Sequence, residues 1–362
     1  MNSNASDISG TKFGYDFVVA TTQASINATK LNFFSTRKEP TVVVCFVADS
    51  KGNPVIIDYD LLKKNAHGTD PFSVHLSAGA DVTSNPAIHN LIAARFLFAF
   101  QAQIGIPRVS NPSSLPNIVT LGSAVQFNLL CSQFTVVQLG PGNKSLLNIS
   151  QPVNAPWVFS SKVDMHLSTV NQSAYSNFPP IVQQGIKNFS NTAFSVQQLL
   201  FDLSNASLMT VPTIPGIAPG TVSYLLLQQN FLGAYFTQLQ VESQPLLGCS
   251  IVLLNTPVST LSLTNLNFIV NPYINSTTLQ PYPNPSRDQQ QLSTLNYLCT
   301  ANGNVPPPAA TFPWNWVDLT QLNNWNGAIA INRNTLANYF RDQLASYVPK
   351  YCLLGLHLPL RH

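Results

Sequence analysis

Long runs in which apolar and polar residues alternate constrain the fold of this chain more than any other feature. The clearest run spans residues 157–168. Its apolar members are Trp157, Phe159, Val163, Met165 and Leu167, and its polar members are Lys162, Asp164, His166 and Ser168. Successive side chains of a strand point to opposite faces, so this pattern predicts a strand with one wet face. Similar runs occur at 96–101, with Phe96, Phe98 and Phe100 on one side, and at 125–132. They predict an antiparallel rather than a parallel sheet.

Apolar residues at helical spacing appear in three long segments. In residues 14–34, a stripe at spacings of three and four follows Asp16 and consists of Phe17, Ala20, Ala24, Ala28 and Leu31. This spacing predicts a helix capped by Asp16 with a stripe of mostly small residues. Residues 224–240 and 335–348 predict two more helices, the last capped by Asn334. Residues 41–57 predict a β-hairpin, and 60–68 a short helix capped by Asp60. We therefore expect an α+β fold.

The composition indicates a folded chain with little net charge. Charged residues make up 9% and hydrophobic residues 45% of the sequence, and the net charge is +3. The basic residues are scattered, which argues against a nucleic-acid partner. No basic stretch followed by an apolar run opens the chain, so we expect no signal peptide and a cytoplasmic location, with secretion by another route left open. No apolar window is long enough for a transmembrane segment, and membrane contact is at most peripheral.

The sequence carries no signature of a cofactor or metal site. The five cysteines are widely spaced without a CxxC pair, which favours buried thiols in a reducing compartment over a zinc site. Phosphate loops, dinucleotide-binding glycines, nucleophile elbows and metalloprotease motifs do not occur. We expect neither a cofactor nor a metal.

Asp164 and His166 are a candidate pair for proton relay, because they share the polar side of the 157–168 strand. They would become catalytic candidates if that side lined a cavity. The alternative, a solvated face of an antiparallel sheet, is favoured.

The apolar side chains are core residues by default, and they become ligand contacts if the interior is incompletely filled. Small residues opposite large aromatic ones leave room for an acyl chain or a terpenoid. The expected ligand-binding set is Ala20, Ala24, Leu31, Phe96, Phe98, Phe100, Trp157, Phe159, Met165, Phe231 and Tyr235.

The segment GYDFVVATTQASIN resembles the start of the accessory proteins encoded beside botulinum neurotoxin, which belong to the tubular lipid-binding (TULIP-like) superfamily and have bacterial and fungal relatives. AFSVQQLLFDLSNA, LNYLCTANGN, FPWNWVD and GAIAINRNTLANYF are similar to later blocks of that group. The resemblance implies long helices wrapped by strongly bent antiparallel sheets in elongated barrels with an apolar interior. We expect one elongated unit with two halves, 1–210 and 211–362, the second shortened at its C-terminal end.

Three functions follow from these expectations. The first is binding of a lipid or another apolar small molecule in an elongated cavity, without catalysis. The second is a cofactor-independent cyclase or isomerase that acts on a hydrophobic secondary metabolite by orientation and selective binding of the transition state. The third, which the resemblance suggests, is a component of a toxin complex with a protein partner.

Overall fold

The fold is taken from a computed structural model of the chain. It describes residues 7–9, 13–36, 38–76, 82–111, 114–122, 124–169, 183–184, 187, 194–241, 246–253 and 261–351.

Three antiparallel sheets make up the described part of the molecule, as the alternating runs predict. Sheet A has the order β12 (Leu263–Asn271), β13 (Thr294–Ala301), β1 (Phe17–Thr22), β14 (Gly327–Ile331). Sheet B has the order β3 (Pro54–Ile57), β2 (Thr41–Ala48), β4 (Phe96–Ile104), β7 (Cys131–Leu139), β8 (Leu146–Ser150). Sheet C has the order β11 (Leu246–Leu253), β10 (Phe194–Thr210), β9 (Phe159–Thr169), β6 (Val125–Leu129), β5 (Val119–Thr120). The predicted hairpin is confirmed as the antiparallel pair β2–β3.

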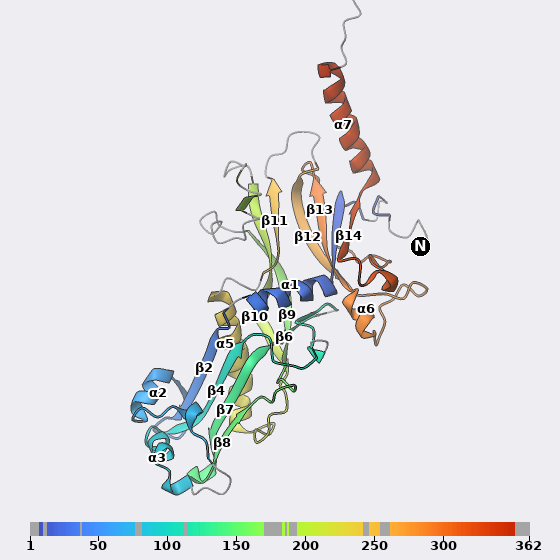
Figure 1. The fold of residues 1–362 in the computed structure, drawn as a ribbon. Helices are drawn as coiled ribbons and strands as arrows, with labels where there is room; N and C mark the ends of the chain where they lie inside the picture. Colours follow the sequence, from blue (N-terminus) through green and yellow to red (C-terminus); the bar gives the residue numbers. More distant parts are fainter. Residues whose placement is uncertain are drawn as a thin grey trace, which may run out of the picture.

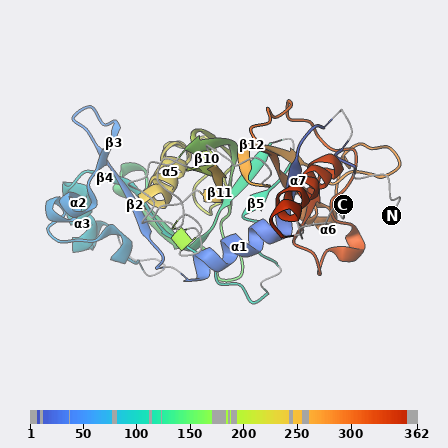
Figure 2. The same ribbon diagram turned by 90° about the horizontal axis from the view of Figure 1, so that it is seen from above.

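The helices are distributed along an elongated molecule (Figure 1). They are α1 (Gln23–Thr36), α2 (Tyr59–Asn65), α3 (Pro86–Ala93), α5 (Val222–Val241), α6 (Arg287–Gln291) and α7 (Arg333–Tyr351). Helix α5 contacts β2, β4 and β10, while α2 and α3 pack on the opposite face of sheet B. Sheet B is therefore covered on both faces. Sheets A and C meet where β11 contacts β12, and they curl into a half-barrel above α1 (Figure 1). Figure 2 shows α2 and α3 at one end of the molecule and α7 near the other.

The first predicted helix is wrong in its N-terminal part, because residues 17–22 form the inner strand β1 of sheet A. Val18, Val19, Thr21 and Thr22 are β-branched, and such side chains pack well on a pleated surface but lose rotamer freedom in a helix. The α-helix begins only at Gln23. The stripe that the sequence predicted along one helix is therefore divided between a strand and a helix.

Both strands that pair with β1 lie far from it in the sequence. It pairs with β13 and with β14, which both belong to the predicted second half of the chain. The division at residue 210 falls at the end of β10 and stays a prediction.

Two helix caps differ from the predicted ones. Asp58 caps α2 by accepting a hydrogen bond of 2.9 Å from the Leu61 amide, whereas Asp60 lies in the first turn and pairs with Lys63 at 2.8 Å. At the start of α7, the Asn334 amide donates to the Asn332 side chain at 2.9 Å. In both helices the side chain that accepts the capping hydrogen bond lies two residues before the predicted cap in the sequence.

Candidate functional site

The predicted aromatic residues other than Phe96 gather in one layer between α5 and the sheets. Phe231 of α5 is completely buried, and its ring lies 4.5 Å from Phe159, 5.0 Å from Phe134 and 5.8 Å from Phe100, measured between centroids. Phe98, Trp157 and Tyr235 belong to the same cluster. In this layer the rings pack against one another, and the role of these residues as ligand contacts stays a prediction.

Tyr235 adds a polar anchor to that layer. Its hydroxyl donates to the Leu130 carbonyl at 3.1 Å, and burial raises the pKa of the phenol well above its ordinary value. A buried tyrosine that is hydrogen-bonded in this way fixes the position of α5 on the sheet.

Phe96 lies apart from the other two residues of its predicted stripe. The pairing of β2 with β4 shifts register, so that Phe46 faces Phe98 but Val47 faces Phe96. This irregularity places Phe96 in the cluster beneath α2 and α3, while Phe98 and Phe100 pack toward α5. The expectation that all three residues share one face is therefore wrong, because an extra residue in one strand reverses the faces beyond it.

The predicted small-residue stripe does not face the aromatic layer as a unit. Ala20 is a buried residue of β1, Ala24 is half-buried on α1, and Leu31 is half-buried against the main core. The fully buried side of α1 consists of Gln23, Ile26, Asn27 and Phe34.

Two amides on α1 dock this helix onto sheet C. The Asn27 side chain donates to the Val119 carbonyl and accepts from the Val119 amide, both at 2.8 Å. Gln23 accepts from the Leu121 amide at 2.6 Å. The side chains thus provide hydrogen bonds to the edge strand β5, which explains why polar residues interrupt the apolar pattern of the helix.

Asp164 and His166 lie on the outer face of β9 and are exposed. Val163, which precedes Asp164, is buried, and Met165, which lies between the two, is half-buried against the main core. The wet-face interpretation fits this arrangement.

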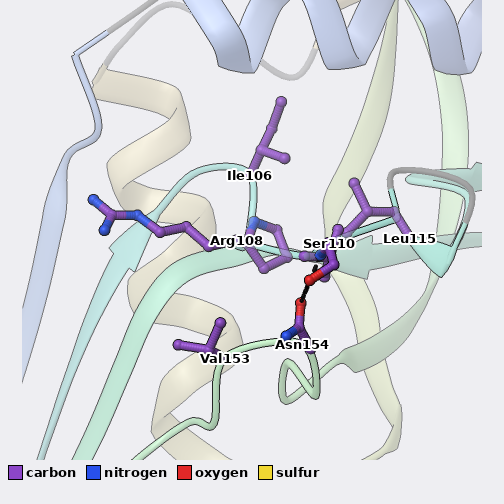
Figure 3. Close-up of a pocket in the computed structure, with 8 residues that line it drawn as sticks. Ile106, Arg108, Ser110, Leu115, Val153 and Asn154 are labelled. Atoms are coloured by element: carbon purple, nitrogen blue, oxygen red, sulfur yellow. Dashed lines mark hydrogen bonds between the residues drawn. The ribbon is translucent and has the colours of Figure 1, made fainter.

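A groove of about 440 Å³ lies between two loops that sequence reasoning did not single out. One loop leaves β4, and the other joins β8 to β9. The lining residues are Ile106, Pro107, Arg108, Val109, Ser110, Leu115, Val153 and Asn154. In Figure 3, Arg108 lies on one side of the groove and Leu115 on the other, with Val153 and Asn154 coming from the second loop.

Hydrogen bonds hold the two loops together at the groove. The Asn154 side-chain oxygen accepts hydrogen bonds from the backbone amide and the hydroxyl of Ser110, the latter at 2.9 Å. The backbone amide of Asn154 donates to the Arg108 carbonyl at 3.2 Å. Asn154 adopts a left-handed conformation, with φ of 68°, which asparagine tolerates better than most residues. The walls of the groove are therefore fixed relative to each other.

Arg108 supplies the charge of the groove. Its side chain is exposed and forms no ion pair with any residue that the structure describes. No carboxylate is among the lining residues. An apolar surface beside an unpaired guanidinium can hold a molecule that has an apolar body and an anionic group, because the guanidinium donates two parallel hydrogen bonds to a carboxylate.

One sequence signal could have drawn attention to this site. Arg108 is the only charged residue between Arg95 and Lys144, and it lies in a proline- and serine-rich loop. A lone charge in a long uncharged segment that contains several strands has no nearby partner along the chain, which is typical of a residue that serves a site.

A second groove, of about 480 Å³, runs between the β2–β3 hairpin and α5. Val43, Val44, Ile56 and Ile57 line one side, and the backbone of Gly233 opens the other, where an added Cβ would meet no atom within 4 Å. The charged side chain in this lining is Asp58. This groove offers apolar contacts without a cation.

Thiol and metal chemistry find little support in the described residues. Cys45, Cys131 and Cys299 are buried free thiols, as predicted, while Cys352 and the side chain of Cys249 lie outside the described part. Burial raises the pKa of the Cys45 thiol to about 12 and that of Cys299 to about 12. No group of three metal-ligating side chains occurs among the described residues. Over the same residues, no helix combines the length and apolarity needed to cross a membrane.

Comparisons with known proteins give distant neighbours. No family model matches the chain, and no curated protein matches it. Among solved structures, it is similar to P47 from Clostridium botulinum A2, with a TM-score of 0.42 and 7% identity over 88% of this chain and 51% of that one. It is also similar to P47 of Clostridium botulinum E1, with a TM-score of 0.36 and 6% identity over 81% of this chain and 46% of that one. The chain thus spans about half the length of each P47 structure.

Proposed function

We propose that this chain binds an apolar small molecule with an anionic group, such as a fatty acid, in the groove beside Arg108, and that it does so without catalysis. The observation that carries the proposal is the position of the Arg108 guanidinium, which forms no ion pair within the described residues, beside an apolar lining from two hydrogen-bonded loops.

The size and composition of the groove support a ligand of this class. A volume of about 440 Å³ falls within the range of about 300–1,000 Å³ that is typical of small-molecule sites. Such sites combine mostly apolar walls with a few polar groups that set orientation. Here Val109, Leu115 and Val153 provide apolar contacts, and Arg108 sets the orientation of the charged end.

The proposal includes a TULIP-like architecture, in which helix and bent sheet enclose an elongated apolar interior. The curl of sheets A and C into a half-barrel supports this arrangement (Figure 1). Half-buried apolar residues of both sheets, such as Phe17, Leu167 and Tyr297, pack against Leu266 and Cys299 and would continue an apolar surface.

A titration of the full chain with fluorescent palmitate tests the proposal. Replacement of Arg108 by glutamine should weaken binding of the acid about tenfold, because a charged hydrogen bond of about 1.4 kcal/mol is lost. Binding of the uncharged methyl ester should stay the same. Lys51→Gln, which removes an exposed charge from the β2–β3 turn, is the matched control and should change neither affinity.

A second substitution probes the apolar wall. Val153 is 72% exposed, so Val153→Asp should leave the fold intact while it repels the anionic ligand and wets the groove. Val305, which is 87% exposed and does not line the groove, provides the control Val305→Asp. Equal affinities for palmitate in the parent protein and in the Arg108 and Val153 variants would refute the proposal.

A further inference from the structure

The groove between the β2–β3 hairpin and α5 has no part in the proposed function. In Figure 2, α5 lies beside β2, and the groove of about 480 Å³ opens between this helix and the hairpin. Its apolar walls come from Val43, Val44, Ile56 and Ile57. The Ile56 side chain is 62% exposed, so the described residues leave much of this apolar surface uncovered.

Gly233 keeps the helical side of the groove open. It lies within α5, where glycine is less favourable than every other residue except proline. Its φ is not positive, and a Cβ added at this position would meet no atom within 4 Å. Neither the backbone conformation nor packing within the described residues therefore requires glycine here. The missing side chain instead leaves room for a molecule in the groove.

Asp58 supplies the charge of this groove. The carboxylate is exposed, and its Oδ1 accepts a hydrogen bond of 2.9 Å from the Leu61 amide. Asp58 forms no ion pair with a described residue, because the ion pair of the nearby Lys63 is with Asp60. The lining contains no lysine, arginine or histidine. The second carboxylate oxygen is therefore available to a cation.

Helix α5 adds neutral acceptors to the same lining through Gln229 and Asn230. The Asn230 side-chain amide donates to the Leu226 carbonyl at 2.7 Å, and its oxygen remains an acceptor. An ammonium group carries three N–H donors and no acceptor. A carboxylate with amide oxygens in one lining suits such a group, and hydrogen bonds between charged groups are stronger than neutral ones.

We propose that this groove binds an apolar molecule with a protonated amine, such as a long-chain alkylamine, with the ammonium at Asp58 and the chain between the hairpin and Gly233. Charge complementarity favours this occupant over an anionic one, which Asp58 would repel. A peptide strand added to β3 fits less well, because this strand has four residues and its Pro54 has no amide N–H. The inference does not rest on ligand binding in the Arg108 groove.

Calorimetric titration of the full chain with decylamine and with the uncharged decanol at pH 7 tests the charge. Alkylammonium groups such as that of lysine are protonated at this pH. The parent should bind decylamine at least tenfold more tightly than decanol. Asp58→Asn should weaken binding of decylamine about tenfold and leave decanol unchanged, because asparagine caps a helix as well as aspartate does. Asp60→Asn, which removes an exposed carboxylate outside the lining, is the matched control.

A second variant tests the open space. Gly233→Met should fill the groove and weaken binding of both decylamine and decanol at least tenfold. The midpoint of its urea denaturation should not fall, because methionine favours a helix more than glycine does. Thr237→Met, at an exposed position of α5 that does not line the groove, should bind as the parent does.

The inference is overturned if the parent does not bind decylamine or binds decanol equally well. It is also overturned if Asp58→Asn or Gly233→Met binds decylamine as tightly as the parent. Palmitate provides the separation from the proposed function, because Gly233→Met should leave its binding beside Arg108 unchanged.

Discussion

At the scale of single residues, Asp16 connects three segments that lie far apart in the sequence. This carboxylate is 5% exposed and accepts hydrogen bonds from the Ala301 amide at 2.7 Å, the Asn304 side chain at 2.9 Å and the Thr335 hydroxyl. The sequence predicted Asp16 as a helix cap. It serves instead as a junction between β1, the end of β13 and the first turn of α7.

Removal of this junction should destabilise the protein strongly. Asp16→Ala leaves buried donors without an acceptor, and we expect a loss of about 3 kcal/mol in the free energy of unfolding, measured by urea denaturation. Asp60→Ala is the control, because this carboxylate is exposed and its ion-pair partner among the described residues is Lys63. It should cost less than about 1 kcal/mol. Equal losses for the two variants would contradict the junction.

Lys30 on α1 provides a prediction about pH. Desolvation lowers the pKa of its ammonium from 10.5 to about 8. Between these pH values the unfolded chain binds more protons than the folded protein. The contribution of Lys30 to the free energy of unfolding therefore rises with pH. Below pH 8 the charged, desolvated ammonium exerts its full destabilising effect.

The measurement compares Lys30→Met with the parent protein at several pH values. The variant should be more stable by about 2 kcal/mol at pH 7, and this advantage should shrink as the pH rises from 8 to 10.5. Lys51→Met, at an exposed turn, should show no such trend. An advantage of Lys30→Met that stays constant with pH would contradict the shifted pKa.

At the scale of secondary-structure elements, the long helix α5 and the strand β9 were predictable from their sequences. Both have apolar residues at the period of their own structure, and the hairpin β2–β3 has a turn between two β-branched runs. The segment 17–36 was not predictable in the same way. Its alanines fit a helical period, but the β-branched residues of 18–22 pair with strands that are distant in the sequence, and local spacing does not reveal such partners.

The attachment of α5 to the sheets should depend on Phe231. This ring is completely buried among Phe100, Phe134 and Phe159, so Phe231→Ala should lower the free energy of unfolding by about 3–5 kcal/mol in urea. Phe340→Ala on α7, where the ring is 56% exposed, is the control and should change stability by less than about 0.5 kcal/mol. A small loss for Phe231→Ala would mean that the aromatic layer is loosely packed.

At the scale of the whole molecule, the antiparallel α+β class followed from the sequence, whereas the sheet order and the groove did not. The groove combines residues 106–115 with residues 153–154, and the strands β5, β6, β7 and β8 separate these loops along the chain. Their proximity results from pairing of β4 with β7 and of β7 with β8. The ligand residues predicted from the sequence were mostly aromatic, because the periodic spacing of apolar residues is visible in a sequence. A groove formed by two loops with one cation has no periodic pattern, so the sequence does not reveal it.

Photo-crosslinking of a diazirine-bearing fatty acid to the full chain, followed by peptide mapping, tests the central claim most directly. The account predicts adducts on both loops of the groove, 106–115 and 153–154, that excess palmitate removes and that Arg108→Gln reduces. Adducts confined to other parts of the chain, or labelling that excess palmitate leaves unchanged, would contradict it.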